Sequence, residues 1–347
     1  MRKAALRIAV ASLACLLARA GNAVTDESIF LASGTARARA LAMGSAYCSL
    51  EDDLSSGLYN PASLCVNAAR AERKFRIFFN PAGSVSAFND YSRYDLDYRE
   101  DRGLSETEIL QAASMLVKGA VFTAPAVDIG FVFHEPAVRG DLSGTLRKRF
   151  FTVEDVTRES FHSAVVKVKI APTVSLGLAG SLYRTREQGK MEYRSGHAFG
   201  VLIDPTPKMK VGLTYMQMPD EAPDSRMELE RFDSGAITGG VSYYPDRETA
   251  LSIDVRNMNR DDRGASREIH AGAERIFAKR AAFRLGYFRK KDTSDDVYSF
   301  GLGILPAWER ISKYRYSARY DLFSYSFVLE EGNSSRHWHV LSLLLRY

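Results

Sequence analysis

The side chains of this sequence that could do chemistry are few, and they do not form a catalytic set. His337 and His339 lie two residues apart, which puts both imidazoles on one face of a strand, but a metal site needs more ligands than this pair. Asp52 and Asp53 could bind a metal or exchange protons. Their carboxylates could also accept backbone hydrogen bonds in a turn, which is the interpretation we favour. A Gly-x-Ser-x-Gly elbow, a P-loop and a dinucleotide-binding fingerprint are all missing, so we expect no enzyme, no metal site and no cofactor.

Four basic side chains alternate with apolar residues: Lys167, Lys169, Lys210 and Arg284. Successive side chains of a strand point to opposite faces, so these four would lie opposite the apolar face. They could contact the anionic head group of an amphiphile. They could also be solvated charges in a wet interior, which is the simpler interpretation.

Two cysteines follow the first twenty-odd residues, Cys48 and Cys65. In an oxidising compartment they could form a disulfide that closes a small loop and stabilises the fold by roughly 3 kcal/mol. They could equally be two thiols that pack as small apolar groups, and the sequence leaves both alternatives open.

Residues 1–23 have the three parts of a secretory signal peptide, with cleavage expected after Ala23 or after Ala20. The full chain has 47 Lys and Arg against 42 Asp and Glu. Without the four basic residues of the leader, the balance is 43 against 42, which is close to neutral. The charge therefore gives no reason to expect a nucleic acid partner.

The rest of the chain shows repeated alternation of apolar and polar residues, which predicts strands. In residues 281–289, Phe283 and Leu285 share one face, while Arg284 and Gly286 share the other. The same pattern recurs in residues 166–170, 174–183 and 208–216. No stretch after the leader approaches twenty apolar residues, which excludes membrane helices. We therefore expect an all-β protein, a transmembrane antiparallel β-barrel of about fourteen strands.

Two segments add detail to this expectation. Residues 105–118 begin with a Ser-x-x-Glu capping box and have apolar residues at helical spacing, which predicts a short helix in an early loop. The chain ends in an alternating strand with Leu343, Leu345 and Tyr347 on one face. This ending resembles the C-terminal signal that the barrel-assembly machinery of the outer membrane binds.

A run of residues between the leader and the first strands has a recognisable order: Met43, Gly44, Asp52, Asp53, Ser55, Asn60, Pro61 and Ala62. It resembles the N-terminal signature of the FadL-like outer-membrane barrels, which include long-chain fatty acid channels and PorV-type secretion-associated barrels. Residues 199–204, 269–274 and 283–287 are similar to recurring strands of the PorV-like group, although Arg275 replaces an aromatic residue of that pattern.

The resemblance implies three parts: a signal peptide (1–23), a hatch that fills the lumen (24–66) and an outer-membrane barrel (67–347). It implies passive uptake of long-chain fatty acids or other small hydrophobic molecules. The alternative is a PorV-like barrel that docks exported proteins or a secretion complex. The expected partners are outer-membrane lipid, a hydrophobic small molecule, the barrel-assembly machinery and, for the alternative, exported proteins.

Overall fold

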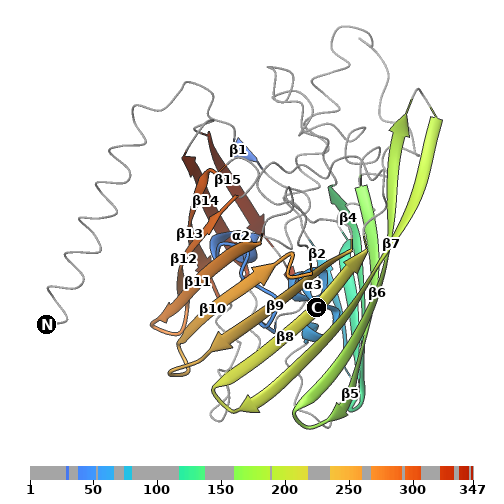
Figure 1. Ribbon diagram of the computed structural model, residues 1–347, viewed down its shortest axis with the longest axis horizontal. Coiled ribbons are helices and arrows are strands. Elements are labelled where there is room, and N and C mark those ends of the chain that lie inside the picture. Colours follow the sequence, from blue (N-terminus) through green and yellow to red (C-terminus); the bar gives the residue numbers. More distant parts are fainter. Residues whose placement is uncertain are drawn as a thin grey trace, which may run out of the picture.

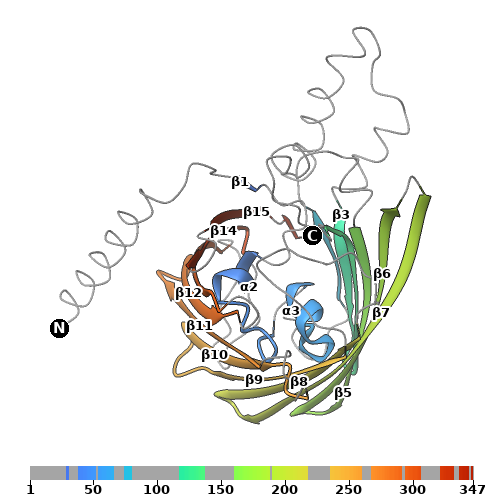
Figure 2. The same cartoon turned by 45° about the horizontal axis from the view of Figure 1, so that its top comes forward.

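The computed structural model describes a strongly curved β-sheet with a helical segment on its concave face (Figures 1 and 2). The described residues are 29–30, 38–51, 54–65, 74–79, 117–136, 160–187, 190–217, 235–259, 267–290, 294–305, 321–331, 336–343 and 345–346. The predicted leader, Asp52, Asp53 and Tyr347 lie outside these residues.

Sixteen strands of the described residues form the sheet. Fourteen of them, β2 to β15, follow one another in chain order, and each is antiparallel to the next. They are β2 (Lys74–Phe79), β3 (Val117–Thr123), β4 (Val127–Pro136), β5 (Ser160–Ala171), β6 (Val174–Glu187), β7 (Lys190–Thr206), β8 (Met209–Gln217), β9 (Ala236–Tyr243), β10 (Thr249–Arg256), β11 (Glu268–Phe277), β12 (Ala281–Arg289), β13 (Asp296–Ile304), β14 (Phe323–Glu331) and β15 (Arg336–Leu343). This confirms the all-β class, the antiparallel order and the number of about fourteen strands that were predicted for the barrel.

Two very short strands lie at the ends of this order. β1 (Ile29–Phe30) pairs in parallel with His339 and Val340 of β15. β16 (Leu345–Arg346) pairs with Phe79 and Phe78 of β2, which brings the last strand segment beside the first long strand. β1 falls within the predicted hatch at 24–66, so these two residues belong to the sheet and not to the segment on its concave face.

Short turns join the strands in pairs at one end of the sheet, for example between β5 and β6, β7 and β8, and β11 and β12 (Figure 1). In the β11–β12 turn, Ala278 and Lys279 both have positive φ, and Arg280 N–H donates to the Phe277 carbonyl at 3.0 Å. This is the geometry of a type I′ hairpin turn, whose twist matches that of the flanking strands. A turn at residues 172–173 joins β5 to β6, and bends at residues 245–248 join β9 to β10.

The helix predicted at 105–118 is wrong at its C-terminal end. Val117 and Lys118 are the first residues of β3, where Val117 pairs with Phe79. Their pairing with β2 outweighs the helical spacing of the local sequence. Residues 105–116 lie outside the described part of the chain.

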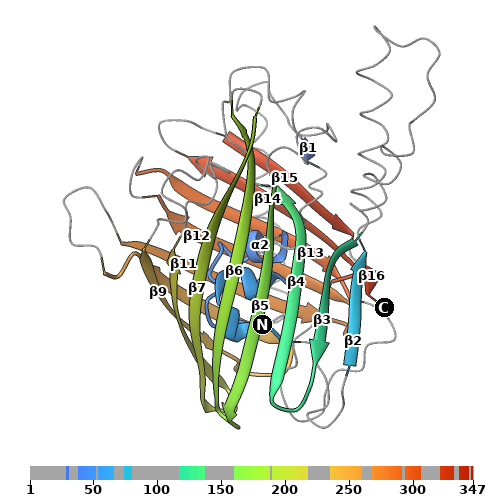
Figure 3. The ribbon, with the colours of Figure 1, turned by 90° about the vertical axis from the view of Figure 1, so that its right-hand side faces the viewer.

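Residues 38–51 and 54–65, here called the inner segment, lie within the curve of the sheet (Figures 2 and 3). They contain α2 (Ala38–Ala42), α3 (Leu54–Tyr59) and the 3₁₀-helix η2 (Pro61–Ser63). Asn60 caps η2, because its side-chain oxygen accepts from Ala62 N–H, and Pro61 follows at a position where no N–H is needed. In the described chain, none of the helices combines the length and apolar character that crossing a membrane requires.

Candidate functional site

The convex face of the sheet exposes large apolar side chains, whereas the concave face buries polar side chains as well as apolar ones. On β12, Leu285 is 53% exposed on the convex face, whereas Arg284 is 2% exposed on the concave face. The alternation predicted for residues 281–289 is therefore confirmed. Convex-face side chains that are large, apolar and exposed occur on strands from β2 to β13, and they include Phe75, Phe122, Phe131, Leu178, Phe199, Leu213, Leu251, Ile253, Phe283, Leu302 and Ile304.

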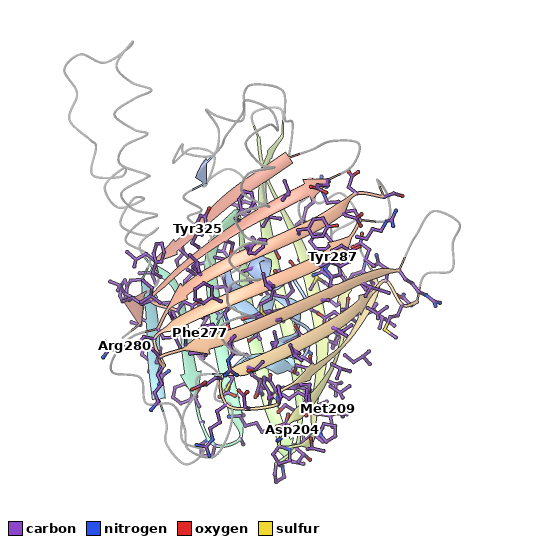
Figure 4. The ribbon with its side chains drawn as sticks, turned by 90° about the vertical axis from the view of Figure 1, so that its left-hand side faces the viewer. Asp204, Met209, Phe277, Arg280, Tyr287 and Tyr325 are labelled. Carbon is purple, nitrogen blue, oxygen red and sulfur yellow. The ribbon has the colours of Figure 1, made fainter. Side chains whose placement is uncertain are left out.

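Aromatic rings lie near both ends of this apolar band. Phe277 and Phe283 pack edge to face at 5.2 Å beside the β11–β12 turn. Tyr287 and Tyr298 lie toward the opposite end of β12 and β13, with ring centroids 5.4 Å apart (Figure 4). An apolar outer band with flanking aromatic residues is typical of strands that cross an outer membrane.

The concave face has an apolar patch that runs across β2 to β7, beside buried polar residues of the same strands such as Asp128, Ser163 and Lys167. Its buried residues come from six neighbouring strands: Phe78, Val121, Val132, Val165, Ala179 and Ala198. Leu54 and Leu64 of the inner segment pack into the same cluster. We call these eight residues the apolar inner cluster. The inner segment thus covers an apolar wall with its own leucines.

The other half of the concave face, formed mainly by β9 to β14, is richer in buried polar residues, which lie beside apolar ones such as Phe288 and Val328. Its buried residues include Ser242, Ser252, Asp254, Arg256, His270, Glu274, Arg284, Ser299, Ser324, Ser326 and Glu330. Many of them hydrogen-bond to the backbone of the inner segment. Ser242 donates to the Ser49 carbonyl at 3.1 Å, and Arg256 donates to the Ser45 carbonyl at 3.0 Å.

A row of glycines lets the inner segment lie directly against the sheet backbone. At each of these glycines, an added Cβ would come closer than 3.0 Å to an atom of the inner segment or to a side chain beside it: Gly177, Gly200, Gly212, Gly240, Gly272, Gly286 and Gly301. The backbone atoms that such a Cβ would meet belong largely to residues 43–49 and 61–62. A side chain at these positions would push the segment off the wall, so the sequence of the strands is fitted to the segment.

Asn60 joins the two halves of the inner segment to the wall. Its amide nitrogen donates to the Cys48 carbonyl at 2.8 Å and to the Val201 carbonyl of β7 at 3.1 Å. Ser63 also donates to the Cys48 carbonyl, at 3.1 Å. Because Asn60 is fully buried, its polar atoms need these partners, which explains why asparagine precedes Pro61 here.

The disulfide considered between Cys48 and Cys65 is not formed, although the structure describes both residues. The Cys48 thiol points toward the wall instead, and its sulfur lies 3.6 Å from the Thr238 carbonyl oxygen. Burial, together with the nearby carboxylate of Asp254, raises the pKa of the Cys48 thiol well above its ordinary value. The thiol therefore packs as a neutral, unreactive group, which was the second of the two alternatives.

A buried ionic network anchors α2 to the sheet. Arg39 of α2 makes two hydrogen bonds to Glu274 of β11, at 2.8 and 2.9 Å. Glu274 also accepts from Arg284 Nε at 2.7 Å, and Arg284 pairs with Asp321 at 2.7 Å. The Arg39 guanidinium in addition lies 5.9 Å from the centre of the Tyr47 ring. Among the described residues, the two arginines of this network are matched by two carboxylates.

A second ionic group holds the inner segment at the strands β5 and β8. Glu51 accepts from Lys167 Nζ at 2.8 Å through Oε1 and from Lys210 Nζ at 2.5 Å through Oε2. Lys210 also pairs with Asp204 at 2.9 Å. Burial opposes ionisation of Glu51, but the two ammonium groups outweigh it and hold the pKa of this carboxyl far below its ordinary value. Glu51 is thus a carboxylate clamped between two lysines.

The four predicted head-group contacts fall into three places. Lys167 and Lys210 meet at Glu51, Lys169 pairs with Asp128 at 2.9 Å and remains 30% exposed, and Arg284 belongs to the separate network with Glu274. Their role toward an amphiphile stays a prediction. Glu51, Arg39 and Glu274 could not be predicted from the sequence, because nothing in their local sequence points to partners that lie 116 to 235 residues away.

The remaining predicted residues are placed as follows. Met43 and Gly44 lie against β11 and β12, and Asn60, Pro61 and Ala62 lie against β6 and β7. Leu343 ends β15 and Leu345 begins β16. Among the described residues, no group of three or more His, Cys, Asp or Glu is arranged to hold a metal ion.

Comparison with protein-family models gives no match for this chain, and comparison with curated proteins gives none either. Among solved structures, the chain is similar to variants of the porin of Rhodopseudomonas blastica. One variant is 9% identical, with a TM-score of 0.35 over 67% of this chain and 78% of the porin. Another is 10% identical, with a TM-score of 0.36 over 67% of this chain and 77% of the porin. At this level of similarity the comparison assigns neither a family nor a cargo.

The described residues offer two kinds of surface and a set of exchangeable contacts. An apolar convex face suits contact with hydrocarbon, and the concave face has an apolar patch and a half that is richer in buried polar residues. The inner segment lies on the concave face and is held there by ion pairs and side-chain hydrogen bonds. A ligand with matching groups could replace these contacts. The resemblance to the FadL-like barrels stays a prediction.

Proposed function

We propose that this chain is an outer-membrane β-barrel through which small hydrophobic or amphiphilic molecules cross passively, past an inner segment that acts as a hatch. The location rests on the exposed apolar band of the convex face and on strand length. Strands β8 to β15 have 8 to 10 residues, close to the length with which a tilted strand crosses the apolar core of a bilayer. In this proposal, the pairing of β16 with β2 closes the barrel.

The observation that carries the choice of cargo is the apolar inner cluster. A barrel that passes only water-soluble molecules has a polar interior, yet here Phe78, Val121, Val132 and Val165 line the concave face of neighbouring strands. A hydrophobic molecule that enters the lumen would be drawn from water to this wall, since burial of apolar area is favourable by about 25 cal/mol per Å². Leu54 and Leu64 of the inner segment must first leave this wall.

Flux through reconstituted vesicles tests this function. The full chain is folded into lipid vesicles that enclose a fatty acid-binding indicator protein, and a long-chain alkyl carboxylate is added outside. Because such molecules also cross lipid unaided, protein-free vesicles give the background rate. The proposal predicts entry faster than this background, with little leakage of a small sugar. Rapid sugar leakage without faster entry of the alkyl chain would overturn it in favour of an open aqueous pore.

One observation favours the alternative function, docking of exported proteins. Strands β6 and β7 have 14 and 17 residues, and their hairpin extends beyond the neighbouring strands at the end opposite the short turns (Figure 1). Strands this long exceed what a bilayer requires. Replacing residues 184–193 by a two-residue turn would remove the extension without touching the inner segment. Loss of a stoichiometric protein partner in this variant, with alkyl carboxylate entry unchanged, would support docking.

A further inference from the structure

The two lysines that hold Glu51 form a site for a single negative charge. Lys167 and Lys210 lie on the wall with Asp204 as a wall carboxylate, so these three groups carry one net positive charge. The neighbouring pair Lys169 and Asp128 is neutral. Among the described residues, the balancing charge is supplied by Glu51, which belongs to the inner segment and not to the wall. The wall alone is therefore an anion site.

The anion site is continuous with the apolar inner cluster. Val165 lies two residues before Lys167 on the same face of β5, a separation of about 7 Å along a strand. From Val165 the cluster continues over β4 and β3 to Phe78 of β2. Neighbouring strands are about 4.8 Å apart, so the apolar wall extends for roughly 14 Å from the strand of the lysine.

The inner segment covers this surface with matching chemistry. Glu51 offers a carboxylate to the two lysines, while Leu54 and Leu64 offer apolar side chains to the six residues of the cluster that belong to the wall. One charged group and an adjacent apolar part are also the features of an amphiphile with a single anionic head group. The segment and such a molecule would compete for the same wall.

We propose that Glu51, Leu54 and Leu64 are a built-in competitor for the ligand, and that an amphiphile with one anionic head group displaces them and so loosens the inner segment. This rests on the proposed function and adds to it the head-group chemistry and the way in which the hatch is released. The Arg39 network on β11 and β12 is separate from this site, so α2 stays anchored while residues 46–51 and 54–65 move.

Binding of three probes to the purified full chain in detergent tests the proposal. The probes are a long-chain alkyl carboxylate, the alkyl phosphate of equal chain length and the neutral alcohol of equal chain length. In Glu51→Gln we expect the anionic probes to bind about tenfold more tightly or better, because removal of a competitor raises the fraction of sites that can bind. Binding of the alcohol should change much less. The head group with the larger gain identifies whether a carboxylate or a phosphate is the better ligand.

Glu330→Gln is the matched control. Glu330 is also a buried acid on the concave face and pairs with one lysine, Lys290, at 2.7 Å, but on other strands. The Glu330→Gln substitution should leave the affinities for all three probes unchanged. In Lys210→Met the anionic probes should lose affinity while the alcohol does not. Folding of each variant is checked by the shift in gel mobility between unheated and heated samples.

A second measurement uses the unaltered Glu51 and so does not depend on the folding of that variant. Cys48 is 1% exposed, so its labelling by a thiol reagent reports loosening of the inner segment. In a Cys65→Ser background, the alkyl carboxylate should accelerate labelling of Cys48, and the alcohol should do so less.

The outcomes separate this inference from the proposed function. The alkyl carboxylate could enter vesicles while Glu51→Gln binds it no more tightly than the wild type and Cys48 is labelled no faster in its presence. That result would refute the role of Glu51 as a competitor and leave the transport function standing. If no probe binds and none enters vesicles faster than the background rate, the proposed function itself fails.

Discussion

Replacing Gly286 by alanine tests the fit between the inner segment and the wall. A Cβ at Gly286 would come far closer than 3.0 Å to Gly44 N, to Met43 C and to Ser299 Oγ. Two of these are backbone atoms, so the clash cannot be relieved by turning a side chain. The inner segment must move away from β12 until Gly44 N and Met43 C reach an ordinary van der Waals separation from the new Cβ.

This movement breaks identifiable contacts. Gly44 N–H donates to Ser299 Oγ at 3.1 Å, and the Gly44 carbonyl lies 2.7 Å from His270 Nδ1. Two hydrogen bonds contribute about 1–3 kcal/mol together, and forcing extra volume into a packed interior costs about 1–3 kcal/mol. The two effects overlap, so we expect the free energy of unfolding to fall by about 2–4 kcal/mol.

Gly180→Ala is the matched control, because a Cβ at Gly180 would have no atom within 4 Å. Alanine is favoured over glycine in a strand by about 0.5–1 kcal/mol, so this variant should be as stable as the wild type or slightly more stable. Urea unfolding in lipid vesicles, followed by gel mobility, gives the free energies, and limited proteolysis gives the protection of the inner segment. If Gly286→Ala matched Gly180→Ala in both measurements, the segment would not lie against β12.

Three further predictions concern the inner segment itself. Asn60→Ala should lower the free energy of unfolding by about 2–4 kcal/mol, since two carbonyls and one N–H lose a buried partner, and urea unfolding measures this. For Glu51, the pKa is lower in the folded state than its ordinary value near 4.5, so its stabilisation is complete above that pH and is lost as the pH falls through the folded-state pKa. The difference in stability between wild type and Glu51→Gln should therefore shrink below about pH 4.5, and a difference that grew there would contradict the clamp. For the cysteines, a reducing agent should leave the free energy of unfolding unchanged. A thiol reagent should label Cys65 faster than Cys48, because Cys48 is buried and its thiol pKa is raised by that burial. A loss of stability on reduction would indicate a disulfide.

Features that repeat along the chain could be predicted from the sequence. The period-two alternation assigned Phe283 and Leu285 to one face and Arg284 to the other, and the exposed fractions agree. Alternation is a local property of a strand, and fourteen strands repeat it, so both the fold class and the faces follow from it.

Contacts between the inner segment and the wall could not be predicted in the same way. Glu51 and Lys167 are 116 residues apart, and Arg39 and Glu274 are 235 residues apart. A charge on the concave face needs a partner, but alternation does not say which strand or segment supplies it. The sequence places glycines such as Gly286 on the polar face. That these glycines make room for the inner segment follows only from the structure.

The choice between a disulfide and two free thiols at Cys48 and Cys65 could not be made from the sequence either. Their spacing permits a disulfide, yet spacing does not give the direction of a side chain. The Asn60 cap fixes the backbone near Cys48, and the thiol then points to the wall at Thr238. The partial error at Val117 and Lys118 arose because strand pairing with β2 overrides a local helical pattern.

Native mass spectra of the protein, released gently from the membrane in which it folds, would test the central claim most directly. The account predicts a barrel that carries a hydrophobic or amphiphilic small molecule, with a larger bound fraction in Glu51→Gln than in the wild type. An empty barrel with a stoichiometric protein partner, unchanged in Glu51→Gln, would contradict passive transport and favour docking.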